Sequence, residues 1–332
     1  MKILLYGELW EGTHIDSISK ELKQLKIDYR TFDFLPYVEY ATPSKLLNKV
    51  FRRVFRKINR KKINNELINE IKLYKPTSFL ISKGIDIYPE TLLKIKDFDI
   101  KIINWNPDDF FNKKNTNINI LNSLKIYDVV FSARKHLFQE YKKRGIKNPI
   151  YLEWYYIPYL HKKINQNIPE DKKLTFVGTY SERRDNIISS IDVINVEIWG
   201  YGWEKSKAIK KHNIMSHNKI LNQTSFPDVM AKSLINLNIL TKENRDNTNL
   251  KIFEIVASGG TILTEKNNIS KKILGADSFY FHDTTDINEI IQKIINHSFE
   301  QLKTKKDNTH QKIVLDNNSI SDRVSQMIKY IK

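Results

Sequence analysis

The stretch of residues 244–265, NRDNTNLKIFEIVASGGTILTE, holds the residue types and spacing best suited to a chemical role. Thr248 or Asn249 can cap a short helix, and a Gly-Gly pair ends it before a β-prone run. The free N–H groups and positive dipole end of such a helix attract phosphate. The Glu254 carboxylate, which we place near the helix start, accepts hydrogen bonds from sugar hydroxyls. The stretch therefore predicts one element that binds both the phosphate part and the sugar part of a nucleotide sugar.

This run resembles the nucleotide-sugar site of GT-B glycosyltransferases, whose retaining members carry an acidic residue, seven spacers and a Glu on a helix. The acidic pair here is Asp246 and Glu254, and Asp246 stands where the family usually has Glu. The sequence NLKIFEIVASGGTILTE resembles the CgeB-like (spore-maturation-protein-like) glycosyltransferases even more closely. The alternative is that Glu254 only caps or pairs on a surface helix. Donor-binding residues implied by the resemblance in this stretch are Asp246, Asn249, Lys251, Glu254, Gly259 and Gly260.

The composition limits the class of protein. A chain of 332 residues suits two domains of about 150 residues each. Cysteine is absent, so a disulfide framework and a thiolate metal site are excluded. No apolar run approaches the length of about 18 residues that a membrane span needs, and we expect a cytoplasmic protein. The 55 Lys and Arg outnumber the 38 Asp and Glu, and the net charge of +17 favours an anionic partner.

The chain opens with a predicted strand over Lys2–Tyr6, a loop, and a helix over His14–Leu25 with an apolar face. This is the first βα unit of a nucleotide-binding type of domain. The loop GELWEGTH lacks the glycine spacing of a dinucleotide fingerprint. It resembles the first loop of GT-B enzymes, which implies that Gly12 and His14 lie on the acceptor side; a His at a helix start is also an ordinary polar residue.

A second feature is a predicted helix over Ser44–Asn65 with an apolar stripe and a strongly basic face. One interpretation is a core-packed helix with solvated charges. Another is a surface that docks residues 45–62 on an anionic membrane, and a third is a nucleic-acid patch. The segment has no acid and nine basic residues, which are Lys45, Lys49, Arg52, Arg53, Arg56, Lys57, Arg60, Lys61 and Lys62.

Two adjacent carboxylates follow a predicted strand over Lys101–Trp105, in the sequence NWNPDDFF. Asp108 and Asp109 therefore lie just past the carboxyl end of a strand, where α/β sheets hold their ligands. Such a pair suits acid/base catalysis or hydroxyl binding, and the alternative is a helix N-cap. A comparable segment occurs in CgeB-like proteins, which favours the catalytic interpretation.

Strands and helices alternate from here onward, which predicts parallel sheets covered by helices on both faces. After an aromatic segment over Glu153–Pro169, a second domain begins with FVGTYSERR. The backbone amides of Gly178 and Thr179, with Arg183 or Arg184, can hold a diphosphate, because guanidinium groups meet phosphate oxygens in a fork. A solvated helix start is the alternative for the two arginines.

A predicted strand over Val196–Gly200 leads into a Gly-Tyr-Gly turn. In GT-B enzymes a strand and turn of this kind lies beside the nucleotide base, which implies base contacts for Gly200, Tyr201 and Gly202. Further predicted elements are a helix over Phe226–Ser233, strands over Ile235–Leu240 and Ser278–Phe281, and helices over Ile287–Ile295 and Ser319–Ile331.

The resemblance implies an α/β fold with two Rossmann-like domains facing a cleft and a C-terminal helix that crosses back to the N-terminal domain. We place the N-terminal acceptor-side domain at 1–155, the nucleotide-sugar domain at 156–316 and the returning helix at 317–332. We expect no bound metal or other cofactor, because the eight His are scattered and GT-B chemistry stabilises the leaving diphosphate with a helix dipole and cations.

The predicted activity is transfer of a sugar from a nucleotide sugar to a hydroxyl of a cell-surface glycan or lipid-linked acceptor, as in polysaccharide biosynthesis. The enzyme would then be cytoplasmic or peripheral on the inner face of the membrane. Two alternatives remain open. One is a glycosyltransferase that modifies nucleic acid, and the other is a nucleic-acid-binding protein without enzymatic activity.

Overall fold

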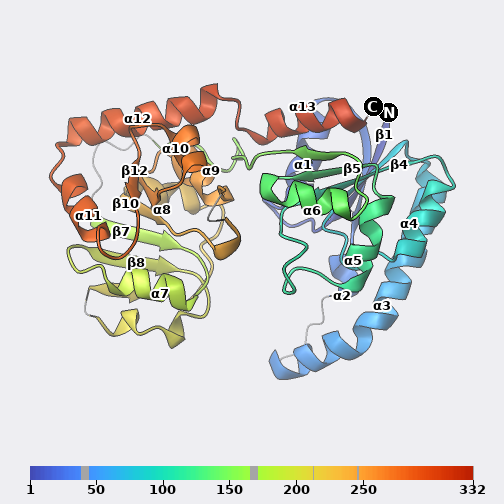
Figure 1. The fold of residues 1–332 in the computed structure, drawn as a ribbon, viewed down its shortest axis with the longest axis horizontal. Helices are drawn as coiled ribbons and strands as arrows, with labels where there is room; N and C mark the ends of the chain where they lie inside the picture. Colours follow the sequence, from blue (N-terminus) through green and yellow to red (C-terminus); the bar gives the residue numbers. More distant parts are fainter. Residues whose placement is uncertain (39–44, 165–170, 212, 245–246, 332) are drawn as a thin grey trace. The chain divides into compact units, whose positions relative to one another are not determined.

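The computed structural model describes residues 1–332 except 39–44, 165–170, 212, 245–246 and 332, and it leaves the side chains of 45–57 and 171 undescribed. The chain divides into two compact units (Figure 1). One unit combines Met1–Glu153 with Ile320–Lys332, and the other is Trp154–Ser319. Each unit is built on its own six-stranded parallel sheet.

The first unit has the strand order β2-β1-β3-β4-β5-β6, with every neighbouring pair parallel. Its elements are β1 (Lys2–Gly7), α1 (His14–Gln24), β2 (Asp28–Asp33), α2 (Leu35–Val38), α3 (Lys45–Tyr74), β3 (Ser78–Ser82), α4 (Pro89–Lys96), β4 (Lys101–Asn106), α5 (Ile118–Ser123), β5 (Val129–Ser132), α6 (Phe138–Lys143), β6 (Pro149–Tyr151) and α13 (Ile320–Ile331).

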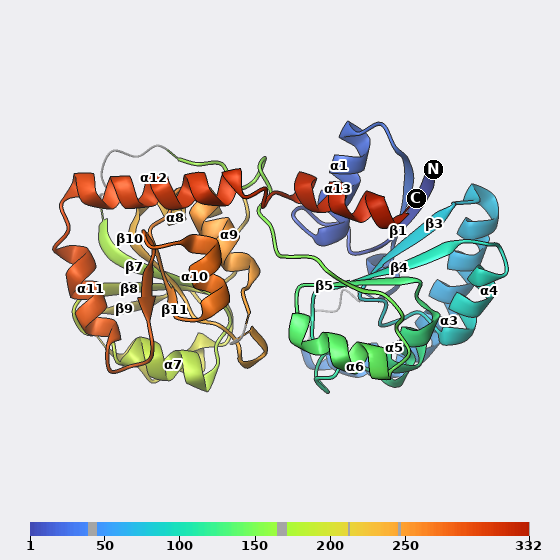
Figure 2. The ribbon, with the colours of Figure 1, turned by 45° about the horizontal axis from the view of Figure 1, so that its top comes forward.

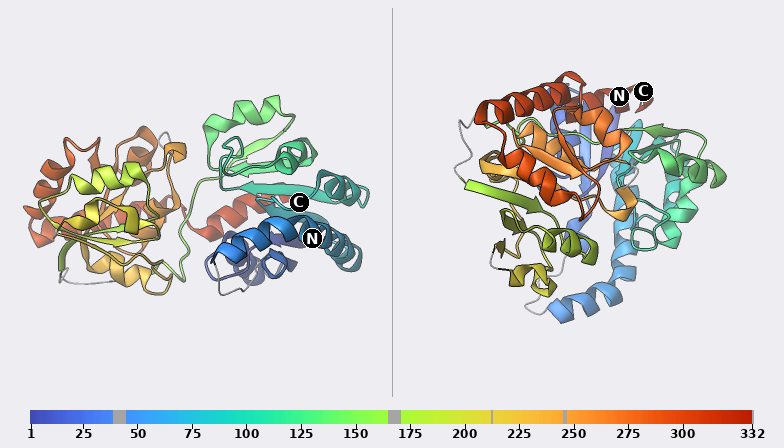
Figure 3. Two further views of the ribbon diagram at one scale, coloured as in Figure 1. Left: turned by 90° about the horizontal axis from the view of Figure 1, so that it is seen from below. Right: turned by 60° about the vertical axis from the view of Figure 1, so that its left-hand side comes forward.

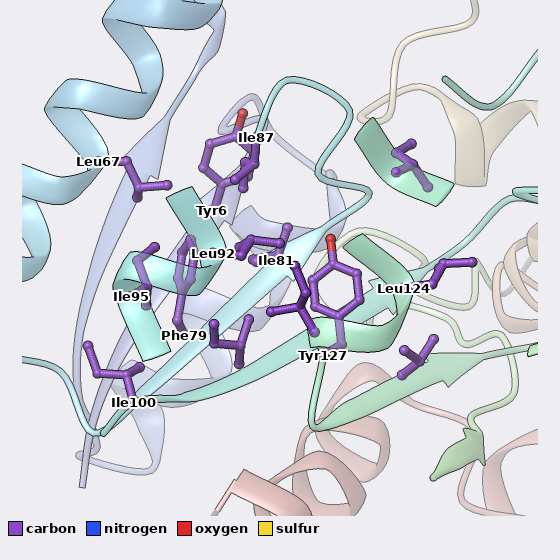
Figure 4. Close-up of a cluster of buried hydrophobic side chains, with 14 of the residues drawn as sticks. Tyr6, Leu67, Phe79, Ile81, Ile87, Leu92, Ile95, Ile100, Leu124 and Tyr127 are labelled. Atoms are coloured by element: carbon purple, nitrogen blue, oxygen red, sulfur yellow. The ribbon is translucent and has the colours of Figure 1, made fainter. Parts of the chain in front are cut away.

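Alternating strand residues divide the core of this unit between the two faces of its sheet. Leu4 and Tyr6 of β1, with Phe79 and Ile81 of β3, belong to one buried cluster with side chains of α3, α4, α5 and α6. Figure 4 shows Tyr6, Phe79 and Ile81 within this cluster. The intervening strand residues are also buried, so both faces of the sheet are covered.

Helix α13 packs against α1 in the first unit (Figure 2, Figure 3). The Ser321 hydroxyl donates to Glu21 Oε2 at 2.7 Å, and the Ser78 hydroxyl at the start of β3 donates to the Ile331 carbonyl at 3.0 Å. The predicted return of the last helix to the N-terminal part of the chain is confirmed.

The second unit has the strand order β12-β11-β10-β7-β8-β9, again all parallel. Its elements are β7 (Asp171–Val177), α7 (Glu182–Ser189), β8 (Asn195–Trp199), β9 (Ile214–Ser216), α8 (Phe226–Lys232), β10 (Ser233–Asn238), α9 (Leu250–Ala257), β11 (Ile262–Glu265), α10 (Asn268–Leu274), β12 (Phe279–Phe281), α11 (Ile287–Ile295) and α12 (Phe299–Leu315).

The two faces of this second sheet differ in polarity. Helices α7 and α11 bury apolar side chains against one face, which carries Leu237 and Leu263. The other face carries Asn236 and Asn238, whose amides reach α8 and the start of α9: Asn236 Nδ2 donates to the Met230 carbonyl at 2.9 Å, and Asn238 Oδ1 accepts from Asn249 Nδ2 at 2.9 Å. Figure 2 shows α7 and α12 on opposite sides of the strands.

Most predicted elements are confirmed, and six of the described helices and strands were not predicted from the sequence: β2, α2, α5, β9, α10 and α12. The edge strand β2 is half polar, and α12 buries few side chains, so neither has a strong apolar period. Helix α3 continues past the predicted end at Asn65 to Tyr74, because Leu67 and Ile71 extend its buried stripe. Ile58, expected to be part of that stripe, is 62% exposed.

Candidate functional site

The loops after β7 and β8 lie in contact at the carboxyl edge of the second sheet, because two glycines face each other. A Cβ on Gly200, at φ +143°, would lie 2.0 Å from the Gly178 carbonyl oxygen. Trp203 Nε1 donates to the same oxygen at 2.9 Å. Only glycine therefore allows the turn after β8 to approach the turn after β7 so closely.

The predicted base-contact residues form the exposed side of the turn after β8. Gly202 has φ +89°, and its N–H donates to Asn218 Oδ1 at 3.0 Å. The Tyr201 carbonyl accepts from the Tyr180 N–H at 2.9 Å, and the Tyr201 side chain is 55% exposed. The backbone is thus held while an aromatic ring remains available to a ligand.

Arg183, at the start of α7, is already paired within its own unit. Its Nη2 and Nη1 contact the two carboxylate oxygens of Glu265 at the end of β11, with 3.2 Å between Nη1 and Oε2. Nη1 also donates to the Leu240 carbonyl at 2.8 Å, and the Leu240 N–H donates to Glu265 Oε2 at 2.5 Å. This charge is therefore shared with a carboxylate before any ligand binds.

Arg184 is held by backbone oxygens instead. Its Nη1 donates to the Thr179 carbonyl at 2.8 Å, and its guanidinium lies 5.4 Å from the Phe176 ring centroid. Burial lowers the pKa of Arg184, with the neighbouring Arg183 charge as a further cause. Of the two predicted arginines, Arg184 is the cation placed against the Gly178–Thr179 turn.

The amino end of α9 is fixed to the neighbouring strand. Asn249 is the N-cap, and its Oδ1 accepts from the Ile252 N–H, as the sequence predicted for Thr248 or Asn249. Thr248 is fully buried. Asp246, the expected acidic partner of Glu254, lies outside the described residues.

Glu254 lies at mid-helix and not at the start of the helix, and it is only 2% exposed. Its Oε2 is 2.5 Å from Lys251 Nζ, and its Oε1 is 3.6 Å from Nε2 of His161. The His161 side chain is fully buried, and burial lowers its pKa. The carboxylate is thus enclosed by a cation and an imidazole.

The structure does not bring Gly259 and Gly260 to the other donor residues. Helix α9 runs from the carboxyl end of β10 to the amino end of β11, so the turn that follows it lies at the opposite edge of the sheet. Gly259 has φ +84° and lies beside Lys163, while a Cβ on Gly260 would lie 2.6 Å from Asn236 Nδ2. Their local role is to permit the tight turn.

In the first unit, the two predicted catalytic carboxylates have different surroundings. Asp108 Oδ2 is 3.0 Å from Lys83 Nζ, and both side chains are about a third or more exposed. Asp109 Oδ1 accepts the Phe111 N–H at 2.8 Å, which closes a turn. Asp108 is therefore the carboxylate that reaches a second functional group.

Lys83 was not predicted as a site residue. It has φ +63° at the end of β3, where its N–H donates to the Trp105 carbonyl and its own carbonyl accepts from Asn104 Nδ2. Such a left-handed, non-glycine backbone costs free energy and occurs often at functional sites. The lysine before a glycine directly after a buried strand was the available signal in the sequence.

The predicted acceptor-side residues lie at the first loop of the same unit. Gly12 has φ +84°, and its N–H donates to Asp16 Oδ2 at 3.0 Å. The His14 ring meets Trp105 edge-on, with 5.7 Å between ring centroids. Trp105 is the last residue but one of β4 and precedes Asp108 by three positions, so the structure brings His14 toward the predicted catalytic segment.

The basic segment 45–62 lies on α3, and most of its side chains fall outside the described residues. Of the described ones, Lys61 and Lys62 are exposed, whereas Arg60 Nε pairs with Asp86 Oδ1 at 2.5 Å. Across the described ranges, no helix combines the length and apolar character that a membrane span requires. Within the same ranges, no group of three or more acidic or His side chains is placed to hold a metal ion.

Comparison with known proteins shows a family match for part of the chain and a shared fold for all of it. Residues 183–329 match the family described as glycosyl transferase-like. A search of curated protein sequences finds no match. The fold resembles an E. coli trehalose-6-phosphate structure bound with UDP-2-fluoro glucose, with TM-score 0.68, 10% identity and coverage of 100% of this chain and 99% of that chain.

Two further solved structures are similar over their whole length. HepE of Anabaena in complex with UDP-glucose has TM-score 0.66 and 10% identity, with 100% of this chain and 99% of that chain covered. The α,α-trehalose 6-phosphate synthase of Burkholderia multivorans has TM-score 0.67 and 8% identity, with 100% and 98% covered. The chain therefore has the fold of GT-B glycosyltransferases over its whole length, and its residues 183–329 match a glycosyl transferase-like family.

Proposed function

We propose that the protein transfers a sugar from a nucleotide sugar, bound at the carboxyl edge of the second sheet, to a hydroxyl of an acceptor bound by the first unit. The observation that carries the proposal is the gathering of glycine turns, an exposed aromatic ring and cations at one sheet edge. Parallel α/β sheets bind their ligands at this edge.

In the proposed complex, the amide of Thr179 and the guanidinium of Arg184 bind the donor diphosphate. The N–H of Gly178, which the sequence also suggested for this role, already donates to the Trp199 carbonyl at 2.8 Å. Gly200, Tyr201 and Gly202 face the base. Asn249, Lys251 and Glu254 complete the donor group at α9, together with Asp246. Arg183 supports this group through Glu265. Charge that develops on the leaving diphosphate is then met by fixed cations and amides, so no metal ion is needed.

The proposed donor is a UDP sugar. Two of the similar structures hold UDP-2-fluoro glucose and UDP-glucose, and both cover this chain completely. At 10% identity these likenesses show the fold, so the base is proposed from them and from the exposed Tyr201 ring. Membership in the CgeB-like group, which the motif of residues 244–265 suggested, remains part of the same proposal.

For the acceptor, we propose a glycan or lipid-linked saccharide whose hydroxyl is oriented or deprotonated by Asp108. The exposed Lys61 and Lys62 support peripheral docking of α3 on an anionic membrane, since each basic residue near such a surface contributes about 1 kcal/mol. Sedimentation of the protein with anionic vesicles at low salt would support this docking. A shift on duplex DNA with no vesicle binding would favour a nucleic-acid acceptor instead.

The donor proposal is tested by calorimetry and thermal denaturation with UDP, GDP, CMP, ADP and dTDP sugars. A ligand present at 100 times its dissociation constant adds about 2.7 kcal/mol to the free energy of unfolding. Stabilisation by a UDP sugar, followed by release of UDP when an acceptor is added, supports the proposal. A protein that none of the five classes stabilises would not be a nucleotide-sugar enzyme.

A further inference from the structure

The buried carboxylate of Glu254 lies between two groups of opposite character in the second unit. Lys251 precedes it by one helical turn, with Nζ 2.5 Å from Oε2. His161 comes from the segment before β7, with Nε2 3.6 Å from Oε1. Glu254 is 2% exposed, and its two oxygens are directed to neighbours within the unit. A sugar hydroxyl therefore has little access to this carboxylate.

The backbone decides which nitrogen of His161 carries the proton. The Ile157 N–H donates to Nδ1 at 3.0 Å, so Nδ1 presents its lone pair. Burial lowers the pKa of His161, which keeps the imidazole neutral and places its proton on Nε2. The Nε2–H group lies 3.6 Å from Glu254 Oε1, so it faces the carboxylate at a distance longer than a hydrogen bond and attracts it through its dipole.

Lys251 is the one member of this trio that reaches solvent. Its side chain is 30% exposed, and its ammonium lies 4.6 Å from the ring centroid of Phe226. It is the second residue of α9, where the helix dipole is positive and a lysine is disfavoured. The Glu254 carboxylate offsets that repulsion and fixes the ammonium on the first turns of α9.

We propose that Glu254 and His161 are positioning residues, which hold the Lys251 ammonium at the amino end of α9 as a binding group for the donor diphosphate. The inference rests on the proposed function. It differs from the direct hydroxyl contact expected for Glu254, because Glu254 then acts through Lys251. It also assigns a role to His161, which lies outside the sequence motif.

A double-mutant cycle separates the two roles. Lys251→Met and Glu254→Gln are each expected to weaken binding of UDP-glucose about tenfold, the loss of one charge-assisted contact. If Glu254 acts through Lys251, the double variant binds no more weakly than Lys251→Met. Additive losses, about 100-fold in the double variant, would mean a separate contact of Glu254 with the ligand and would overturn the inference.

A second probe, inorganic pyrophosphate, has no sugar hydroxyl. Glu254→Gln should weaken pyrophosphate binding by the same factor as UDP-glucose binding. Unchanged pyrophosphate binding in Glu254→Gln, with weakened UDP-glucose binding, counts against the inference. Melting temperatures of all variants show whether each is folded, and the double variant removes the Lys251 and Glu254 charges together.

The role of His161 is tested by two substitutions that each keep one of its nitrogens. The amide of His161→Gln reproduces the Nε2 donor, and that of His161→Asn reproduces the acceptor for Ile157. The inference predicts near-normal UDP-glucose affinity for His161→Gln and several-fold weaker affinity for His161→Asn. Equal affinities in the two variants would remove His161 from the proposal.

The matched control is Lys293 and Glu289, an exposed ion pair on α11 in the same unit, with 2.5 Å between Nζ and Oε1. Lys293→Met and Glu289→Gln should bind UDP-glucose like wild type. Failure of the proposed function looks different: if wild type binds no sugar nucleotide of the five classes, the function and the inference fall together. Wild-type binding with additive losses overturns the inference alone.

Discussion

Arg183 and Glu265 form a forked ion pair between the start of α7 and the end of β11, 82 residues apart in the sequence. In the sheet, β10 lies between β11 and β7, the strand that leads into α7, so the pair links the start of α7 to the end of a strand two positions away. Leu240 joins it through both its N–H and its carbonyl. Arg183 is therefore held in an ion pair within the protein, whereas the adjacent Arg184 lies against the Gly178–Thr179 turn.

Substitution of these arginines should therefore give different results. Arg183→Met is expected to lower the free energy of unfolding by about 1 to 3 kcal/mol, because Glu265 loses its charged partner. Arg184→Met should leave stability nearly unchanged and weaken UDP-glucose binding about 10- to 100-fold. Denaturant unfolding and calorimetry measure the two quantities, and equal losses of affinity in both variants would contradict the division.

Substitutions of the two carboxylates after β4 should also differ in their effects on turnover. Asp108→Asn keeps the shape and removes the base, so turnover should fall about 100-fold or more with donor affinity nearly unchanged. Asp109→Asn retains the oxygen that accepts the Phe111 N–H, and turnover should fall less than about tenfold. Steady-state rates with saturating donor test this, and the reverse order of the two variants would refute the assignment of Asp108.

Because the turns after β7 and β8 are in close contact, adding one methyl group at Gly200 should strongly affect stability and binding. Gly200→Ala would place its Cβ against the Gly178 carbonyl oxygen and should cost about 2 to 4 kcal/mol and abolish nucleotide-sugar binding. Gly145→Ala is the control, since Gly145 also has positive φ but its Cβ would meet only Lys125 Cβ at 3.3 Å. It should cost about 1 kcal/mol and leave binding intact.

The buried His161 predicts a dependence of stability on pH. Its pKa is lowered in the folded protein by burial, so below the ordinary value of about 6.5 the unfolded chain binds the proton and the folded protein does not. The free energy of unfolding should fall as pH decreases through this window, by up to about 1.4 kcal/mol per pH unit for this group.

The comparison variant for this pH effect is His161→Gln, which has no titrating group and should show a shallower fall between pH 6.5 and 5. His310, whose pKa burial also lowers, contributes equally to both proteins. Urea unfolding at several pH values measures the difference. Parallel pH profiles for wild type and His161→Gln would show that His161 titrates alike in the folded and unfolded states.

The sequence by itself determined the elements that carry the candidate site. The apolar period and the Asn249 cap predicted α9, buried runs predicted most strands, and alternation predicted parallel sheets. These signals are local, since hydrophobic period and capping depend on residues a few positions apart. For the same reason the half-polar β2 and the sparsely buried α12 gave too weak a pattern to be predicted.

Only the tertiary structure decided what each polar side chain contacts. Glu254 has the same place in the motif whether it is exposed or buried, and its contact with His161 comes from a segment outside that motif. Lys83 meets Asp108 because β3 and β4 are neighbours in the sheet. Periodicity tells which face of an element is covered, but the partner across that face depends on how distant elements pack, and this fixes which charges remain available to a ligand.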